Sequence, residues 1–91
     1  MDRPIYAAKR FVTTWRSLDP RLQGKVIDVI LALPDLVAKP HQHRGYGFRR
    51  LHGSDFWEAR LDLRWRVILR IGPKEFVLFD VMNHDQVRRL G

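Results

Sequence analysis

Apolar residues in the first part of the chain are spaced as in an amphipathic helix. The set that carries this spacing is Phe11, Val12, Trp15 and Leu18. It predicts a helix over residues 9–18 with one apolar face. Just upstream, the stretch RPIYAAK favours a short strand that brings Ile5 into a sheet. This segment should therefore form a strand followed by a helix.

A second helix should follow almost at once. Asp19 is suited to cap a helix N-terminus, and Pro20 is suited to the first helical position. Beyond them an apolar stripe continues at helical spacing: Leu22, Val26, Val29, Ile30 and Leu33. Proline lacks the N–H that a helix interior needs, so we expect Pro34 and Pro40 to end this helix, which should run from about Pro20 to Leu33.

The spacing changes after Gly45 and Gly47. Residues 48–53 favour a short strand. Three segments rich in β-branched and aromatic residues follow, 55–61, 64–71 and 75–82, and Gly72-Pro73 lies in the turn between the last two. Residues 83–90 then predict a short helical turn capped by Asn83. The pattern predicts one α+β domain over residues 1–91. Two N-terminal helices should pack on one face of a mainly antiparallel sheet of four or five strands.

The alternation of side chains in residues 56–71 predicts the register of the central hairpin. If the loop spans the three residues 62–64, Arg60 lies opposite Arg66 and Ala59 opposite Val67. Apolar residues then share one face and charged residues share the other. A two-residue loop would mix the faces, and one step of slippage would expose the buried face. We therefore expect the three-residue loop.

The face away from the helices, here called the outer face, should be rich in charge. Its expected members are Glu58, Arg60, Arg66 and Arg70, with Asp80 as a further candidate. Like charges directly opposite each other on paired strands repel. Two interpretations follow. Either an anion or Glu58 lies between the opposed arginines, or the face is solvated and Glu58 and Asp62 act as local counter-charges.

The charge of the chain points to acidic partners. The formal net charge is +7, the sequence pI is about 10.8, and arginine far outnumbers lysine. A basic domain of this kind most often binds nucleic acid or an acidic protein, and arginine recognises phosphate with a forked geometry. A GC-rich genome that favours arginine codons is the other explanation. The chain has no cysteine, and no stretch is apolar enough to span a membrane, so we expect a cytoplasmic protein.

Order, spacing and length together carry a family resemblance over nearly the whole chain. Two helices precede a strand ending LHG, and then come FWEARL, RWRVILR, VLFDV and a histidine just after the last strand. This arrangement resembles the RelE/ParE superfamily of bacterial type II toxins, and the RelE-type mRNA endonucleases fit best. The resemblance implies a RelE-like fold and cleavage of mRNA on the ribosome without a metal or another cofactor.

The resemblance also implies roles for particular residues. Arg60 matches a basic residue on the central hairpin that contacts phosphate. Arg66 matches the arginine that stabilises the transition state. His84 falls where RelE-like members have an arginine and YoeB-like members have a histidine that acts as acid or base.

Three positions depart from the family pattern. Glu58 stands where RelE has a lysine. The glutamate of YoeB-like members would fall near residues 45–47, where there is no carboxylate, and the stacking tyrosine of many relatives would fall near Leu90. The phosphate-binding half of the site is thus complete, whereas the base and the stacking group are not assigned. Glu58 could accept the proton, or it could pair with Arg60 or Arg66, and we favour the pairing.

Further residues could extend an RNA surface. The candidates are Arg49, Arg50, Arg70 and Tyr46, of which Tyr46 could stack on a base or cover the edge of the core. Trp57 and Trp65 should belong to the core. His41 and His43 lack a nearby carboxylate or thiolate, so a metal site is not expected.

Three functions are consistent with these observations. The first is an RNA-cleaving toxin, the second is a ParE-like inhibitor of DNA gyrase without nuclease activity, and the third is a RelE-like module that binds RNA or protein without catalysis. Arg60, Arg66 and His84 together favour the first, because ParE-like members usually lack this set. A toxin of this type implies a cognate antitoxin with an acidic or amphipathic segment.

Overall fold

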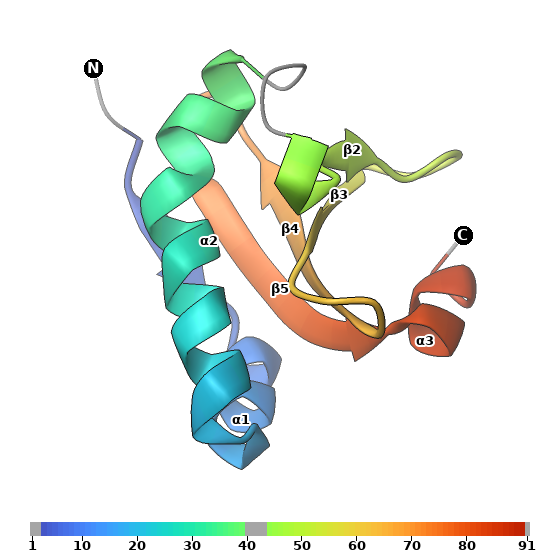
Figure 1. Cartoon of the computed structure of the whole chain (residues 1–91). Helices are drawn as coiled ribbons and strands as arrows, with labels where there is room; N and C mark the ends of the chain where they lie inside the picture. The colour runs from blue at the N-terminus through green and yellow to red at the C-terminus, as the bar shows by residue number, and fades with distance from the viewer. Residues whose placement is uncertain (1–2, 40–43, 91) are drawn as a thin grey trace.

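The structure, a computed structural model, describes residues 3–39 and 44–90. Its elements in chain order are β1 (Ile5–Ala7), α1 (Lys9–Ser17), α2 (Pro20–Ala38), the short 3-10 helix η2 (Arg44–Tyr46), β2 (Arg49–Arg50), β3 (Phe56–Arg60), β4 (Trp65–Ile71), β5 (Phe76–Asn83) and α3 (His84–Arg88). The expected α+β class with a short C-terminal helix is confirmed. In Figure 1, α2 runs along one side of the sheet, and α3 lies on the other side of the view, beyond the end of β5.

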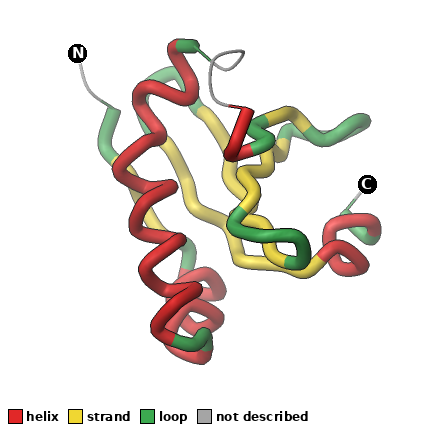
Figure 2. Tube along the Cα trace, in the orientation of Figure 1, coloured by secondary structure: helices red, strands yellow, loops and turns green. Residues whose placement is uncertain are grey.

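The strands form a mixed five-stranded sheet in the order β1-β5-β4-β3-β2. The first strand pairs with β5 in parallel, and the pairs β5-β4, β4-β3 and β3-β2 are antiparallel. The parallel pairing of β1 with β5 is possible because the chain between them, residues 8–75, is far longer than the dozen or so residues that a parallel connection needs. In Figure 2 the long helix α2 (red) runs along one side of the molecule, and the strands (yellow) lie beside it.

The core lies between the sheet and the two N-terminal helices. Buried side chains of α2 supply one wall: Leu22, Val26, Val29, Leu33 and Leu36. The sheet supplies the other wall through Ala59, Val67, Leu69, Leu78 and Val81. Trp57 and Trp65 pack against this core, and the Phe48 and Trp57 rings stack with centroids 5.0 Å apart, so both tryptophans lie on the core side as expected.

The second helix is longer than expected. It continues through Pro34 to Ala38, so the expected end at Leu33 was wrong. The reason is packing: Leu33 and Leu36 flank the proline and are both completely buried. Their burial outweighs the hydrogen bond that a proline removes from a helix.

The central hairpin has the expected register. Arg60 pairs with Arg66 and Ala59 with Val67, and the Leu61 N–H donates to the Trp65 carbonyl at 2.9 Å, which leaves the three-residue loop 62–64. The alternation of apolar and charged side chains therefore specified the pairing, because a shift by one residue would have turned charged side chains into the apolar core between sheet and helices.

The last strand contains a bulge. Leu69 pairs with Leu78, but Ile68 pairs with Asp80, so Phe79 is an extra residue in β5. Strict alternation from Leu78 would have turned Asp80 toward the core. The bulge instead places Asp80 on the outer face beside Ile68, as the charge pattern suggested, and it keeps Val81 in the core.

Candidate functional site

The outer face is charged, yet much of it is buried. Glu58, Arg66 and Asp80 are only 5%, 9% and 7% exposed, and Ile68 beside them is completely buried. A buried charge is stable only where it is paired and hydrogen-bonded. The partners of these groups therefore decide which of them can act on a ligand.

Glu58 is engaged by two arginines. Arg49, its cross-strand partner on β2, donates from Nε to Glu58 Oε1 at 2.7 Å. The Nε of Arg66 lies 3.9 Å from Glu58 Oε2. This arrangement supports the pairing role for Glu58, since both carboxylate oxygens already face guanidinium groups.

Arg66 is held by the hairpin loop as well as by Glu58. Its Nη1 donates to the backbone carbonyls of Asp62 at 2.8 Å and of Trp65 at 3.1 Å. Oxygen atoms thus surround a guanidinium group that is almost buried. The side chain is fixed before any ligand arrives, which is the property that an electrostatic catalyst requires.

Arg60 differs from its partner across the hairpin. It is exposed, and it makes no hydrogen bond or ion pair with any residue that the structure describes. Its guanidinium lies against Gly47, where an added Cβ would stand 3.5 Å from both Nε and Nη2. Gly47 has a φ of +53°, a conformation that favours glycine, and it lets the loop and the Arg60 side chain approach each other closely.

His84 is the first residue of α3 and is exposed. Asn83 caps this helix and forms a reciprocal pair of hydrogen bonds with Gln86, as the sequence predicted for the cap. Met82 on β5 pairs with Arg66 on β4, and His84 comes two residues after Met82. The backbone therefore brings Arg60, Arg66 and His84 to the same end of the sheet, while the Arg60 and Arg66 guanidinium groups have different surroundings.

The other candidate RNA contacts are divided between two sites. Arg50 donates to the Ser54 carbonyl and lies 3.4 Å from Asp55, whereas Tyr46 is half-buried against the core. Arg70 lies over the ring of Phe56 with its central carbon 4.6 Å from the ring centroid. Arg50 and Arg70 therefore lie away from Arg60 and Arg66, whereas Tyr46 lines a hollow together with Arg60.

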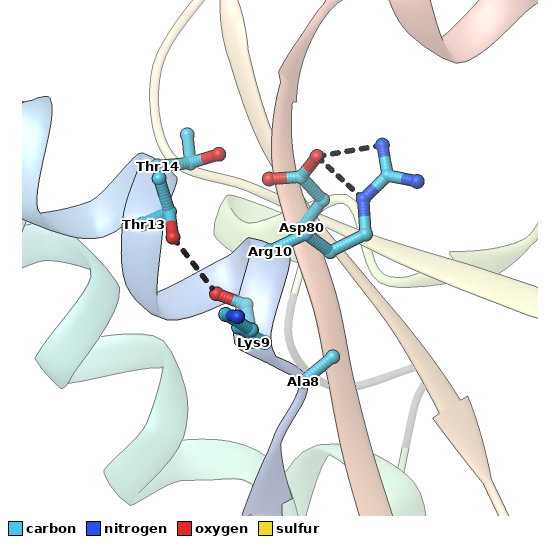
Figure 3. Close-up of a pocket in the computed structure, with 6 residues that line it drawn as sticks. All are labelled: Ala8, Lys9, Arg10, Thr13, Thr14 and Asp80. Atoms are coloured by element: carbon cyan, nitrogen blue, oxygen red, sulfur yellow. Dashed lines mark hydrogen bonds and ion pairs between the residues drawn. The ribbon is translucent and has the colours of Figure 1, made fainter.

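Sequence reasoning missed Arg10 of α1, which lies beside the outer face. Its Nε and Nη2 both donate to Asp80 Oδ2, at 3.1 and 2.9 Å, as Figure 3 shows. The guanidinium also lies over Phe79, which packs on Phe56 with centroids 4.7 Å apart. Together with Arg70, which lies over Phe56, these groups form a row in which two packed aromatic rings lie between two arginines. No sequence periodicity relates them.

The carboxylate in the hollow beside Arg10 is already occupied. Its lining in Figure 3 is Ala8, Lys9, Arg10, Thr13, Thr14 and Asp80. Asp80 Oδ1 accepts from the Val81 N–H at 2.8 Å, and Oδ2 accepts from Arg10. The Thr13 hydroxyl donates to the Lys9 carbonyl. We therefore assign this hollow to the packing of α1 against β5.

Asp62 in the hairpin loop is a second residue whose importance the sequence did not indicate. Its Oδ1 accepts from the Arg64 and Trp65 N–H groups at 2.8 and 2.7 Å, and its Oδ2 lies 3.3 Å from Arg21 Nη2. Partial burial opposes ionisation, but the two backbone hydrogen bonds and Arg21 outweigh it and lower the pKa of Asp62 below 3.8.

Within 3–39 and 44–90, no group of three or more His, Asp or Glu side chains could hold a metal ion. His41 and His43 lie outside the described residues. No helix in the described part of the chain is both long and apolar enough to cross a membrane.

Comparison with known proteins gives a likeness in structure but none in sequence. No protein-family model and no curated protein sequence matches the chain. The structure of YafQ from E. coli strain BL21(DE3) superposes with a TM-score of 0.76 at 14% identity, covering 94% of this chain and 98% of that one.

Two toxin–antitoxin complexes are similar as well. The E. coli DinJ-YafQ complex has a TM-score of 0.72 at 17% identity, over 93% of this chain and 97% of the matched one. The archaeal RelE-RelB complex from Pyrococcus horikoshii OT3 has a TM-score of 0.68 at 19% identity, over 91% and 96%. At such identities a likeness establishes the fold alone. This chain has the fold of the YafQ and RelE toxins over nearly its whole length.

Proposed function

We propose that this protein is the toxin of a type II toxin–antitoxin system and that it cleaves mRNA on the ribosome without a metal. The observation that carries the proposal is the RelE-like fold together with Arg60, Arg66 and His84 at one end of the sheet. The net charge of +7 suits a polyanionic substrate.

The proposed reaction is attack of an RNA 2′-hydroxyl on the adjacent phosphate. It needs a group that takes the hydroxyl proton, cations for the charge that develops on phosphorus-bound oxygens, and an acid for the departing 5′-oxygen. Arg66, fixed by two carbonyls and Glu58, is suited to the developing charge. The Arg60 side chain, which has no partner among the described residues, is suited to bind a neighbouring phosphate of the RNA and so to position the one under attack.

His84 is the proton-transfer group in this proposal. It is exposed at the start of α3 and follows closely on the partner of Arg66. A histidine titrates near neutral pH and can act as acid or base. Glu58 is assigned a positioning role, because Arg49 and Arg66 already occupy its oxygens.

A cognate antitoxin is the proposed protein partner, and the cytoplasm, where ribosomes translate mRNA, is the proposed location. The structures of similar fold include toxins solved with DinJ or RelB. This chain exposes Ile27 and Leu31 one turn apart on α2, with 45% and 76% of their surface accessible. An amphipathic segment with acidic residues would cover such apolar side chains and complement the basic charge.

One observation favours a second candidate, a module that binds RNA or protein without catalysis. The Arg66 guanidinium already has oxygen partners and is almost buried. If those contacts persist when RNA binds, Arg66 cannot reach a phosphate. The cellular experiment below distinguishes this candidate from the nuclease.

The test is to induce this chain with and without the gene beside it and to map mRNA ends. The proposal expects growth arrest, cuts at defined codon positions, and relief by the neighbouring gene product. His84→Ala should abolish the cuts while the chain stays folded. Growth arrest with intact messages and broken DNA would point instead to a gyrase inhibitor, and arrest that survives His84→Ala with neither lesion would favour the non-catalytic module.

A further inference from the structure

A second polar cavity lies between α2, η2 and the end of β3. Its volume is about 290 Å³, and its lining is Lys25, Asp28, Val29, Gly45, Tyr46, Arg60 and Leu61. Neither Arg66 nor His84 belongs to this lining. Arg60 thus turns toward a site that includes α2, and the family resemblance did not suggest any residue of that helix.

The charge of the cavity suits one phosphodiester. Arg60 has no hydrogen-bond or ion-pair partner in the part of the chain that the structure describes. Lys25 is half-buried, and its Nζ makes a single long hydrogen bond, 3.4 Å, to the Leu61 carbonyl. Two cations and the Asp28 carboxylate leave a formal charge of +1, which one phosphodiester would neutralise. The partial burial of Lys25 strengthens its attraction for an anion, because less water screens its ammonium than screens a fully exposed one.

The remaining lining suits a nucleobase. Tyr46 packs against the core and also lines the cavity. Aromatic side chains next to cations are the usual means of holding single-stranded RNA, because bases stack on them. Gly45 leaves room: a Cβ added there would meet no atom within 4 Å.

We propose that this cavity binds one nucleotide of single-stranded RNA, with its phosphate between Arg60 and Lys25 and its base against Tyr46. The inference rests on the proposed function and deepens it, because it adds Lys25 of α2 to the RNA-binding residues. Arg60 pairs with Arg66 across the hairpin, so the bound nucleotide lies next to the phosphate that Arg66 and His84 would act on.

The experiment measures binding of a fluorescent, single-stranded RNA hexamer whose 2′-oxygens are methylated, so that it cannot be cleaved. Lys25→Gln removes one cation from the cavity. Lys74→Gln is the matched control. It removes the same charge, but Lys74 is exposed in the turn between β4 and β5, away from the cavity. Gly45→Leu fills the cavity without changing charge, and Gly45 does not have the positive φ that a leucine would resist.

The inference expects Lys25→Gln to weaken binding about tenfold and to reduce the slope of log K against log salt by about 0.7, the value for one phosphate contact on a single strand. Gly45→Leu should weaken binding by a similar factor with the slope unchanged. Lys74→Gln should change the dissociation constant less than about twofold. Thermal unfolding establishes that each variant is folded, and if Lys25→Gln is not, Gly45→Leu decides the question.

Equal binding by Lys25→Gln and Lys74→Gln, or wild-type binding by Gly45→Leu, would overturn the inference. The mRNA-end mapping described above is independent of this assay. Cuts in cells that persist in both cavity variants, with hexamer binding unchanged, reject the cavity and leave the nuclease standing. Cavity-dependent hexamer binding without any cuts supports the cavity and rejects the nuclease.

Discussion

Arg60 and Arg66 lie directly opposite each other on β3 and β4, yet only Arg66 is neutralised. Two backbone carbonyls and Glu58 surround the Arg66 guanidinium, whereas Arg60 turns to Gly47 and the cavity beside α2. The repulsion expected between directly opposed like charges is therefore relieved by sending the two groups to different surroundings.

This difference predicts unequal contributions to stability. Arg66→Ala removes two hydrogen bonds and one partner of the buried Glu58, so it should lower the free energy of unfolding by about 2–4 kcal/mol. Arg60→Ala should change it by less than about 0.5 kcal/mol, because an exposed side chain without partners contributes little. Urea denaturation of both variants tests the contrast, and equal losses would contradict it.

His84→Ala should separate activity from stability. His84 is exposed and makes no hydrogen bond or ion pair with the described residues, so the midpoint of thermal unfolding should stay within about 2 °C of wild type. Cleavage of mRNA should fall at least about 100-fold, the usual contribution of a positioned acid or base. Gln86→Ala is a useful control: it weakens the cap of α3 and leaves the imidazole in place. If Gln86→Ala loses cleavage while His84→Ala keeps it, His84 is not the proton-transfer group.

Asp62 should stabilise the hairpin in a pH-dependent way. Asp62→Ala leaves the Arg64 and Trp65 N–H groups without their acceptor and should cost about 1–3 kcal/mol at neutral pH. Asp62→Asn keeps an acceptor oxygen and loses only the partly exposed Arg21 contact, so it should cost less than about 1 kcal/mol.

The sign of the pH effect follows from the lowered pKa of Asp62. Its ionised form is the one that folding stabilises, so the contribution is complete above 3.8 and is lost as the pH falls through the lower folded pKa. The stability difference between wild type and Asp62→Ala should therefore shrink as the pH falls below about 4. A difference that grows on acidification would contradict this account.

Pro34→Ala should stabilise the protein. The change restores an N–H inside α2 and removes a poor helix former, and both effects stabilise the folded state. Alanine also leaves the unfolded chain more flexible than proline does, which offsets part of this gain. We expect a net rise in the free energy of unfolding of about 1–2 kcal/mol. Gly24→Ala is the matched control, because Gly24 lies in the same helix and an added Cβ meets no atom within 4 Å. It should gain about 1 kcal/mol by helix propensity alone.

The pair formed by Arg10 and Asp80 should couple α1 to the sheet. Arg10 is half exposed, at 54%, so Coulomb attraction is partly screened, and a double-mutant cycle with Arg10→Ala and Asp80→Asn should give a coupling of about 1 kcal/mol. Arg10→Lys should retain only part of it, because lysine loses the forked contact and the stacking on Phe79. A coupling indistinguishable from zero would mean that the contact does not contribute.

The elements that the sequence predicted well are those with a regular spacing of apolar residues or a recognisable helix cap. Alternation specified the pairing of Arg60 with Arg66, and Asn83 was recognisable as a cap from its place after an apolar strand. The predicted end of α2 at Leu33 was wrong, because the prediction used only the low helix propensity of Pro34. The burial of Leu36, which keeps the helix going, depends on the sheet and cannot be seen in the local sequence.

Side-chain directions could not be read in the same way. The path of Arg60 depends on the left-handed conformation of Gly47, and the partner of Arg10 lies 70 residues away in β5. Both are consequences of tertiary structure and leave no periodic signal. Sequence alone could therefore assign Arg66 and Glu58 to one face, but it could not show that the Arg60 guanidinium would turn from them toward Gly47 and the cavity beside α2.

The extra residue in β5 has a consequence for protein engineering. A bulge increases the local twist of its strand, and Phe79 lies only five positions before His84. Removing Phe79 would restore simple alternation without reversing the side of any neighbour, since Leu78 and Val81 would still face inward. A designer could therefore reorient the imidazole relative to the arginines by a one-residue deletion, leaving every proposed catalytic group unaltered.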